Sequence, residues 1–240
     1  MPATATETPD PIQIMNVLII FAHHEPSSFS AALLEVAVTA LRASGHHVDV
    51  SDLYQMGFDP VSDRRNFNSV FDPARLSQQA EEVHATRVGG FAADVQAEIA
   101  KLLLCDLLVF HFPLWWLGMP AILKGYVDRV FAAGVAYGGG RYFEGGVMRG
   151  KRAMCVVTAG GLAQQYDGTG HYAPIETVLY PVHRGVFEFT GFEVVPPFVA
   201  YGPNRVGASG RRRMLAELRW RMASMEPGVA AREVSDRNPT

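Results

Sequence analysis

A hydroxyl-rich segment, residues 22–32, reads Ala-His-His-Glu-Pro-Ser-Ser-Phe-Ser-Ala-Ala and lies between an apolar run and a helical pattern. Free N–H groups and the dipole at the start of a helix favour an anion, and Ser27, Ser28 and Ser30 add donors. The segment lacks the Gly-Lys-Ser/Thr of a P-loop and the Gly-x-Gly-x-x-Gly of a dinucleotide turn. It predicts either an anion-binding turn of another kind or a plain serine N-cap.

A second segment, residues 113–120, places two tryptophans in a loop between prolines. Trp115 and Trp116 would give a flat, rigid, apolar surface beside a sheet edge, which suits the stacking of a planar heterocycle. The alternative is that these rings form a hydrophobic plug or a dimer contact.

A third segment, Thr158-Ala159-Gly160-Gly161, is followed by Tyr166 and His171. Paired glycines let the backbone approach a ligand closely, and their N–H groups can face an electron-rich edge. A single Tyr or His is usually structural, but together Tyr166 and His171 are candidate proton donors beside a bound ring.

Other kinds of site find little support in the sequence. It has no Gly-x-Ser-x-Gly, no Cys-x-x-Cys and no His-Glu-x-x-His, so we expect neither a serine hydrolase nor a metal site. Residues 211–213, with Arg219 and Arg221, are typical of a solvated basic helix face, and contact with a cofactor phosphate is the alternative.

The elements that position these segments alternate along the chain. Five apolar runs predict buried strands, and five patterns with apolar residues every three or four positions predict helices. Such alternation is typical of a doubly wound parallel sheet in one α/β domain, whose ligand binds at the carboxyl ends of the strands. The expected strands span 15–21, 47–50, 107–112, 153–158 and 192–195, and the expected helices span 30–44, 92–104, 120–131, 174–189 and 208–225.

One segment departs from this alternation. Residues 58–90 are polar, contain several turn signals and are too long for an ordinary connector, so they predict a functional or disordered loop. Residues 1–14 and 227–240 are expected to be disordered tails on either side of a domain at 15–226.

The composition limits the class of protein. The chain has 240 residues, and its 21 basic and 24 acidic side chains give a net charge of −3, which argues against a nucleic-acid partner. Cys105 and Cys155 lie in apolar runs and predict reduced, buried thiols, which fits a cytoplasmic protein. The apolar stretch 102–123 contains Asp106 and two prolines, so it predicts strand, loop and helix rather than a membrane span.

The three segments, in this order, resemble the NAD(P)H:quinone oxidoreductase (DT-diaphorase) family of flavodoxin-like flavoproteins. The resemblance runs from about Val17 to about Arg221, and residues 22–30, 112–125 and 158–161 carry it. The string Phe-Pro-Leu-Trp-Trp-Leu-Gly-Met-Pro-Ala-Ile-Leu-Lys-Gly at 112–125 is specific, because few other families place such a run after the third strand. The resemblance implies a flavodoxin-like, doubly wound sheet of five parallel strands in the order 2-1-3-4-5.

The resemblance also implies how a flavin would be held. The ribityl-diphosphate would lie on the first segment, the isoalloxazine on the second and its pyrimidine end on the third. The insertion at 58–90 is similar to that of FAD-binding members, which favours FAD over FMN. The implied cofactor residues are His23, Ser28, Phe29, Ser30, Ala32, Pro113, Leu114, Trp115, Trp116, Leu117, Thr158, Ala159, Gly160, Gly161 and Tyr166, and the implied substrate residues are Trp116, Tyr137, Gly160 and Phe189.

The chain departs from the family pattern at several positions, including Ser77, near which a family glutamine aligns. Trp115 replaces a glutamine of the second segment, and Gly139 replaces a second pocket tyrosine. Ungapped alignment puts Tyr172 at the place of the active-site histidine, whereas a shift of one residue would put His171 there. We take Tyr166 and His171 as candidate catalytic residues, with Tyr172 as the alternative to His171.

The implied activity is a two-electron, ping-pong transfer of hydride from NAD(P)H through a bound flavin to a quinone or a similar acceptor. Family members are dimers with a pocket shared between subunits, so we expect a homodimer. Alternatives are a flavoprotein that regulates a membrane transporter, or a nitro- or azo-reductase of the same fold. A one-electron flavodoxin-type carrier fits less well, because a strongly acidic surface is expected of it and the net charge here is −3.

Overall fold

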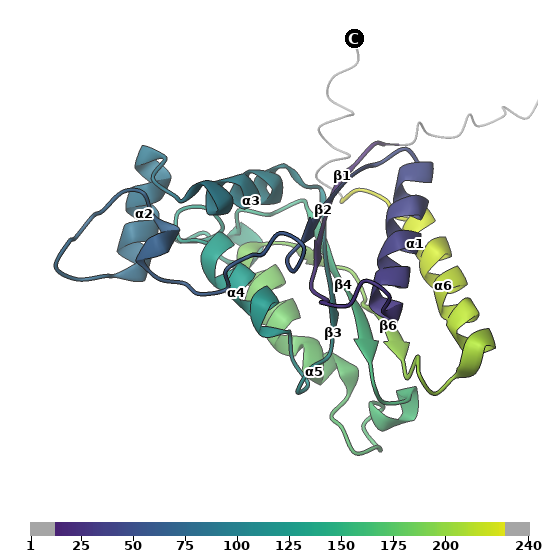
Figure 1. The fold of residues 1–240 in the computed structure, drawn as a ribbon. Helices are drawn as coiled ribbons and strands as arrows, with labels where there is room; N and C mark the ends of the chain where they lie inside the picture. The colour runs from purple at the N-terminus through teal and green to yellow at the C-terminus, as the bar shows by residue number, and fades with distance from the viewer. Residues whose placement is uncertain (1–12, 229–240) are drawn as a thin grey trace, which may run out of the picture.

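A parallel sheet with helices on both faces forms the centre of the computed structural model, which describes residues 13–228 (Figure 1). The strand order is β2-β1-β3-β4-β5, and a sixth strand, β6, also pairs with β4. The expected doubly wound sheet and its order are therefore confirmed. The strands are β1 (Asn16–Phe21), β2 (His47–Asp52), β3 (Leu107–Pro113), β4 (Arg152–Ala159), β5 (Glu193–Val194) and β6 (Phe198–Tyr201).

Two short strands share one edge of the sheet where a single strand was expected. β5 pairs with β4 at Arg152 and Ala153, and β6 pairs with it from Val156 to Ala159. Pro196 and Pro197 separate the two strands, and proline has no N–H to donate to a ladder. The expected strand at 192–195 is thus shortened, and β6 was not predicted.

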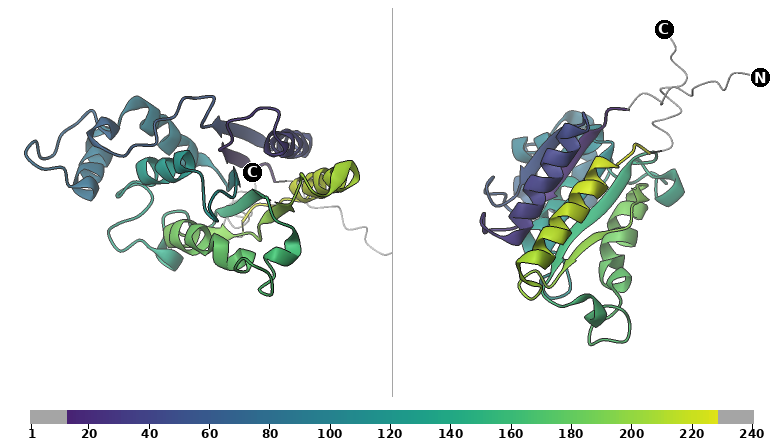
Figure 2. Two further views of the ribbon diagram at one scale, coloured as in Figure 1. Left: turned by 60° about the horizontal axis from the view of Figure 1, so that its bottom comes forward. Right: turned by 90° about the vertical axis from the view of Figure 1, so that its right-hand side faces the viewer.

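Two helical layers cover the sheet. Helices α1 (Phe29–Ala43) and α6 (Gly207–Ala223) lie side by side on one face (Figure 2), and α3 (Ala93–Leu104), α4 (Ala121–Val130) and α5 (Ile175–Val182) cover the other. Alternate residues of β1 belong to the two cores, as expected of a strand buried on both sides. The boundaries of α1, α3, α4 and α6 agree with the predicted helices to within two residues.

Residues 58–90 form ordered structure, so of the two predicted alternatives, a functional or a disordered loop, the disordered one is wrong. A short 3₁₀ turn, η1 (Arg64–Asn66), precedes a helix that was not predicted, α2 (Gln78–Val88). Buried polar side chains hold this region in place of an apolar stripe. Glu81 accepts the N–H groups of Phe71 at 2.7 Å and Asp72 at 3.1 Å, and Glu82 accepts that of Ala133 at 2.6 Å.

The helix expected over 174–189 has two parts. α5 ends at Val182, and a π-helical segment, η4 (His183–Glu188), follows it. Pro181 lies inside α5 and lacks the N–H that would continue the α-helical ladder, which explains a change of helical type at this point.

The sequence also led to expectations about the two cysteines and about the apolar stretch 102–123. Cys105 and Cys155 are buried and unpaired, as predicted. The stretch 102–123 contains the end of α3, then β3, a turn and the start of α4, and none of the helices among residues 13–228 is long and apolar enough to cross a bilayer. The expected tails lie almost wholly outside the described residues, and within them Gly228 is buried.

Candidate active site

The three predicted segments meet at one edge of the sheet, because β1, β3 and β4 are adjacent and parallel. Phe21 of β1 pairs with His111 of β3, and Pro113 of β3 pairs with Thr158 of β4. The loops that follow these strands therefore start side by side, as the carboxyl ends of parallel strands must.

The start of α1 combines a serine cap with free backbone donors. The Ser28 side chain accepts the N–H of Ala31 at 3.1 Å. The N–H groups of Phe29 and Ser30 have no partner among residues 13–228. The serine N-cap is thus present, and it leaves two amides able to bind an anion.

A buried hydroxyl pair joins the first and third segments. Ser30 Oγ and Thr158 Oγ1 lie 2.9 Å apart, and both side chains are buried. The sequence placed both residues at the site without indicating this bond. It fixes the start of α1 relative to the end of β4.

The loop after β3 contains a strained two-residue turn. The backbone groups of Trp115 and Gly118 exchange hydrogen bonds of 3.1 and 3.0 Å, while Trp116 and Leu117 between them have φ values of 54° and 56°. Such a turn normally carries Asn-Gly, because side chains rarely adopt positive φ. Strain of this kind is concentrated at functional sites, where the surrounding structure maintains it.

The two tryptophans differ in their surroundings. Trp116 is fully exposed, whereas the Trp115 ring lies 6.2 Å from that of His23 and 5.6 Å from that of His24, measured between centroids. Burial lowers the pKa of His23, and the nearby His24 adds a smaller effect in the same direction. Trp115 thus packs against the first segment and stays 37% exposed, and Trp116 is the more exposed of the two rings.

The loop after β4 brings Tyr166 against the paired glycines. No atom lies within 4 Å of the place where a Cβ of Gly160 would be, so the backbone is open there. A Cβ at Gly161 would lie 2.8 Å from the ring of Tyr166, which requires glycine at this position. Tyr166 is buried. Burial raises its pKa, and the neighbouring Tyr172 adds a smaller effect in the same direction.

The structure brings Tyr172, rather than His171, to Tyr166. The rings of Tyr166 and Tyr172 stack with centroids 4.8 Å apart. His171 is exposed, and it makes no hydrogen bond, ion pair or ring contact with the described part of the chain.

Two predicted substrate residues form a separate cluster. The rings of Tyr137 and Phe189 lie 5.6 Å apart, with Tyr142 and Phe143 also against Phe189. Ile175 donates its N–H to the carbonyl of Tyr166 and starts the helical segment that ends at Glu188, so Phe189 lies at the other end of that segment, roughly 20 Å along the axis. Tyr137 and Phe189 therefore lie apart from Tyr166.

One buried polar residue beside the site was not singled out from the sequence. His111 of β3 has no exposed surface, and neither ring nitrogen has a hydrogen-bond partner among the described residues. Burial, followed by a smaller effect of His23, lowers its pKa to about 3. A histidine within an otherwise apolar strand was the available signal.

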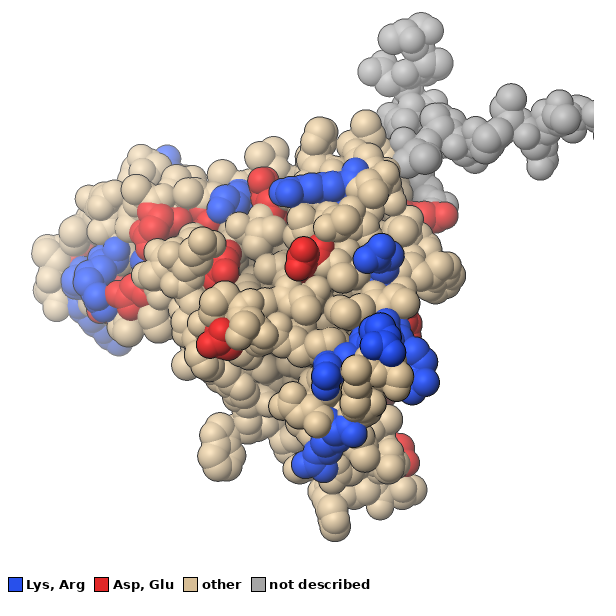
Figure 3. Space-filling model, turned by 45° about the vertical axis from the view of Figure 1, so that its right-hand side comes forward, with Lys and Arg blue, Asp and Glu red and all other residues tan. Residues whose placement is uncertain are grey.

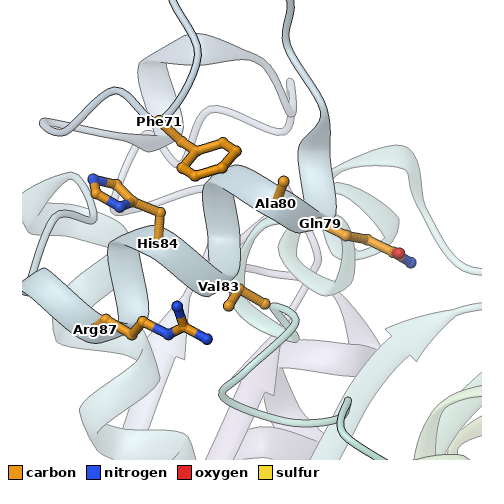
Figure 4. A pocket seen from close by; sticks show the side chains of 6 residues that line it. All are labelled: Phe71, Gln79, Ala80, Val83, His84 and Arg87. Carbon is orange, nitrogen blue, oxygen red and sulfur yellow. The ribbon is translucent and has the colours of Figure 1, made fainter.

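A cavity of about 340 Å³ lies over α2, away from these loops (Figure 4). None of its lining residues belongs to the predicted site. The cavity is lined by Phe71, Gln79, Ala80, Val83, His84 and Arg87.

Residues 13–228 include no group of three or more His, Cys, Asp or Glu placed to bind a metal ion.

The arginines of α6 only partly form a solvated face. Arg212, Arg213 and Arg219 are exposed, and basic side chains gather on the face shown in Figure 3. Arg211 donates to the carbonyl of Pro203 at 3.2 Å, and Arg221 donates to the carbonyls of the two prolines before β6. These two arginines therefore attach α6 to the loops around β6.

Comparison with known proteins identifies the family of this chain. The sequence profile of the flavodoxin-like fold matches residues 15–222. The chain is 45% identical over 221 residues to a ribosyldihydronicotinamide dehydrogenase-like protein of Penicillium crustosum, covering 88% of this chain and 81% of the relative. It is 36% identical to NAD(P)H dehydrogenase [quinone] 1 of Cavia porcellus, covering 88% and 78%. The chain belongs to the NAD(P)H:quinone oxidoreductase family.

A solved structure supports membership of the quinone oxidoreductase family. A Klebsiella pneumoniae protein described as a quinone reductase superimposes with a TM-score of 0.84 at 39% identity, over 89% of this chain and 86% of that one. The resemblance identified from the three segments is therefore confirmed. The family is one of oxidoreductase enzymes.

Proposed function

We propose that this protein is a flavin-dependent NAD(P)H:quinone oxidoreductase that transfers two electrons as hydride to a quinone or a similar acceptor. The observation that carries the proposal is the meeting of three loops at the ends of β1, β3 and β4, in a chain whose relatives include proteins named NAD(P)H dehydrogenase [quinone] 1 and ribosyldihydronicotinamide dehydrogenase [quinone]. Two structures described as azoreductases are 19% and 22% identical to this chain, a likeness that shows the fold alone.

The residues present fit a flavin. Two unpaired amides at the start of α1, Phe29 and Ser30, would hold a diphosphate. The turn at 115–118 and the open backbone at Gly160 would border the isoalloxazine. A bound flavin would supply the hydride relay between NAD(P)H and the acceptor.

The side chains around this edge would position the reactants and stabilise charge. The phenol of Tyr166 keeps its proton because burial raises its pKa, so it can donate a hydrogen bond to a negatively charged oxygen. The N–H groups of Gly160 and Gly161 would add donors on the same side. Trp116 would cover the acceptor and exclude water from it.

We favour FAD over FMN because the insertion at 58–90 is ordered and packed on α4. Arg129 of α4 donates to the side chain of Asn66 at 2.7 Å and to the carbonyl of Asp59 at 2.8 Å. A segment held in this way can form a fixed wall for the adenosine half of the larger cofactor.

We further propose a homodimer with a shared pocket. Tyr137 and Phe189 cluster at the end of the α5–η4 segment away from Tyr166, so a second copy would bring such a cluster to the acceptor. Exposed apolar side chains beside this region, Val70, Phe71 and Val88, offer surface for such contact. The buried, unpaired Cys105 and Cys155 support a cytoplasmic location.

The decisive experiment identifies the chromophore and the substrates. The purified protein is heated, the released flavin is identified by chromatography, and a quinone panel is assayed with NADH, NADPH and ribosyldihydronicotinamide. The last donor is included because the Penicillium crustosum relative is named for it. A colourless protein that binds neither FAD nor FMN would contradict the proposal.

The role of Tyr166 has its own test. Tyr166→Phe retains the stacked ring but removes the phenolic donor, so flavin reduction followed by stopped flow should slow about 10²-fold or more. Flavin affinity should stay unchanged, which serves as the control for folding. An unaltered reduction rate would remove Tyr166 from the mechanism.

A further inference from the structure

Tyr166 and Tyr172 lie on one short loop after β4, and hydrogen bonds fix both. The N–H of Tyr172 donates to the carbonyl of Gln165 at 3.0 Å, and the N–H of Ile175 donates to that of Tyr166 at 3.1 Å. The Gln165 side chain accepts the N–H of Leu162 at 2.9 Å. The loop therefore holds the two aromatic side chains in a defined relation to β4.

The two rings form a stack with an inner and an outer member. Their planes are inclined by 27°, and Tyr166 is 6% exposed whereas Tyr172 is 38% exposed. Both pack on Gly161, where a Cβ would lie 2.8 Å from Cε2 of Tyr166 and 3.3 Å from Cε2 of Tyr172. Tyr172 is thus the accessible aromatic residue of the pair beside the open Gly160 backbone.

We propose that Tyr172, and not His171, donates a hydrogen bond to the carbonyl oxygen of the quinone-like acceptor. The inference rests on the proposed function and names a residue that determines acceptor affinity. His171 has no contact with the described residues that would orient its ring, whereas stacking orients Tyr172.

The test uses the flavin-loaded protein and a redox-inert aryl ketone, xanthone, whose binding is followed by the change in flavin absorption. Tyr172→Phe keeps the stack and should weaken xanthone binding about 2- to 12-fold, the value of one net hydrogen bond. It should also slow reoxidation by 2-methyl-1,4-naphthoquinone by a similar factor. His171→Asn is the matched control and should change neither quantity.

Two outcomes would overturn the inference. One is that Tyr172→Phe binds xanthone normally, and the other is that His171→Asn weakens xanthone binding by the factor expected of Tyr172→Phe. If the unmodified protein binds no flavin in a fluorescence titration, the proposed function itself fails and this inference falls with it.

Discussion

His111 is a buried imidazole without a hydrogen-bond partner in the middle of the sheet, with its ring 5.2 Å from that of Phe21. Its pKa in the folded protein is about 3, against an ordinary value of 6.5. The unfolded chain therefore binds a proton that the folded protein excludes between these values. The contribution of His111 to stability is full above pH 6.5 and is lost as the pH falls toward 3.

We predict that His111→Leu makes the protein less sensitive to acid. At pH 4.5 protonation of the unfolded chain at His111 should cost the unmodified protein about 3 kcal/mol relative to pH 7. Urea denaturation at both pH values should show this loss reduced by that amount in the variant. His47→Gln, at an exposed position, is the control, and an equal acid loss in both variants would refute the assignment.

The turn at 115–118 links residue conformation to the site. Replacing Trp116-Leu117 by Asn-Gly supplies residues that suit positive φ, so the flavin-free protein should gain about 1–2 kcal/mol in unfolding free energy. Little packing is lost, because Trp116 is fully exposed and Leu117 is 42% exposed. Flavin affinity should fall, because the ring surface is lost.

Chemical denaturation of the flavin-free protein and a flavin titration measure the two effects. Ala43→Gly, near the end of α1, serves as a comparison that alters backbone freedom away from the site. A destabilised Asn-Gly variant would show that the turn is not strained.

At the scale of elements, α2 depends on polar contacts. Glu81 is buried and accepts two N–H groups of the preceding loop, and it also pairs with Arg64 at 3.4 Å. Glu81→Ala should therefore release the loop before α2, so that trypsin cuts more readily after Arg75, which is already exposed. Limited proteolysis should cut the variant faster than the unmodified protein, whereas Glu35→Ala, on the exposed face of α1, should not change the cleavage rate.

The predictability of each element follows from what stabilises it. Strands β1 to β4 and helices α1, α3, α4 and α6 bury apolar residues, so hydrophobic periodicity revealed them. α2 is held by the buried carboxylates Glu81 and Glu82, and β6 follows two prolines, so neither gave the usual pattern.

The site was predictable to a similar extent. The three segments followed from the strand ends, because topology alone brings them together. The choice between His171 and Tyr172 could not be predicted from the sequence, because it depends on how one loop packs on Gly161. The clustering of Phe189 with Tyr137, Tyr142 and Phe143 also depends on three-dimensional placement that no local pattern encodes.

At the scale of the whole molecule, a shared pocket would couple assembly to stability. If two copies bury the surface around Val70, Phe71 and Val88, thermal unfolding should shift to higher temperature as the protein concentration rises. Sedimentation should show a dimer, and Phe71→Asp should favour the monomer. A midpoint independent of concentration, together with a monomeric mass, would contradict the dimer.

The divided edge formed by β5 and β6 has a consequence for solubility. An unpaired strand edge can recruit a foreign strand and start polymerisation, and natural proteins limit this hazard with short strands, prolines and charge. Here the outer ladder is interrupted by Pro196 and Pro197, and the opposite edge strand, β2, exposes His47 and Asp49. Neither border of the sheet in residues 13–228 presents a long apolar template, so the fold resists amyloid-like stacking even at high concentration.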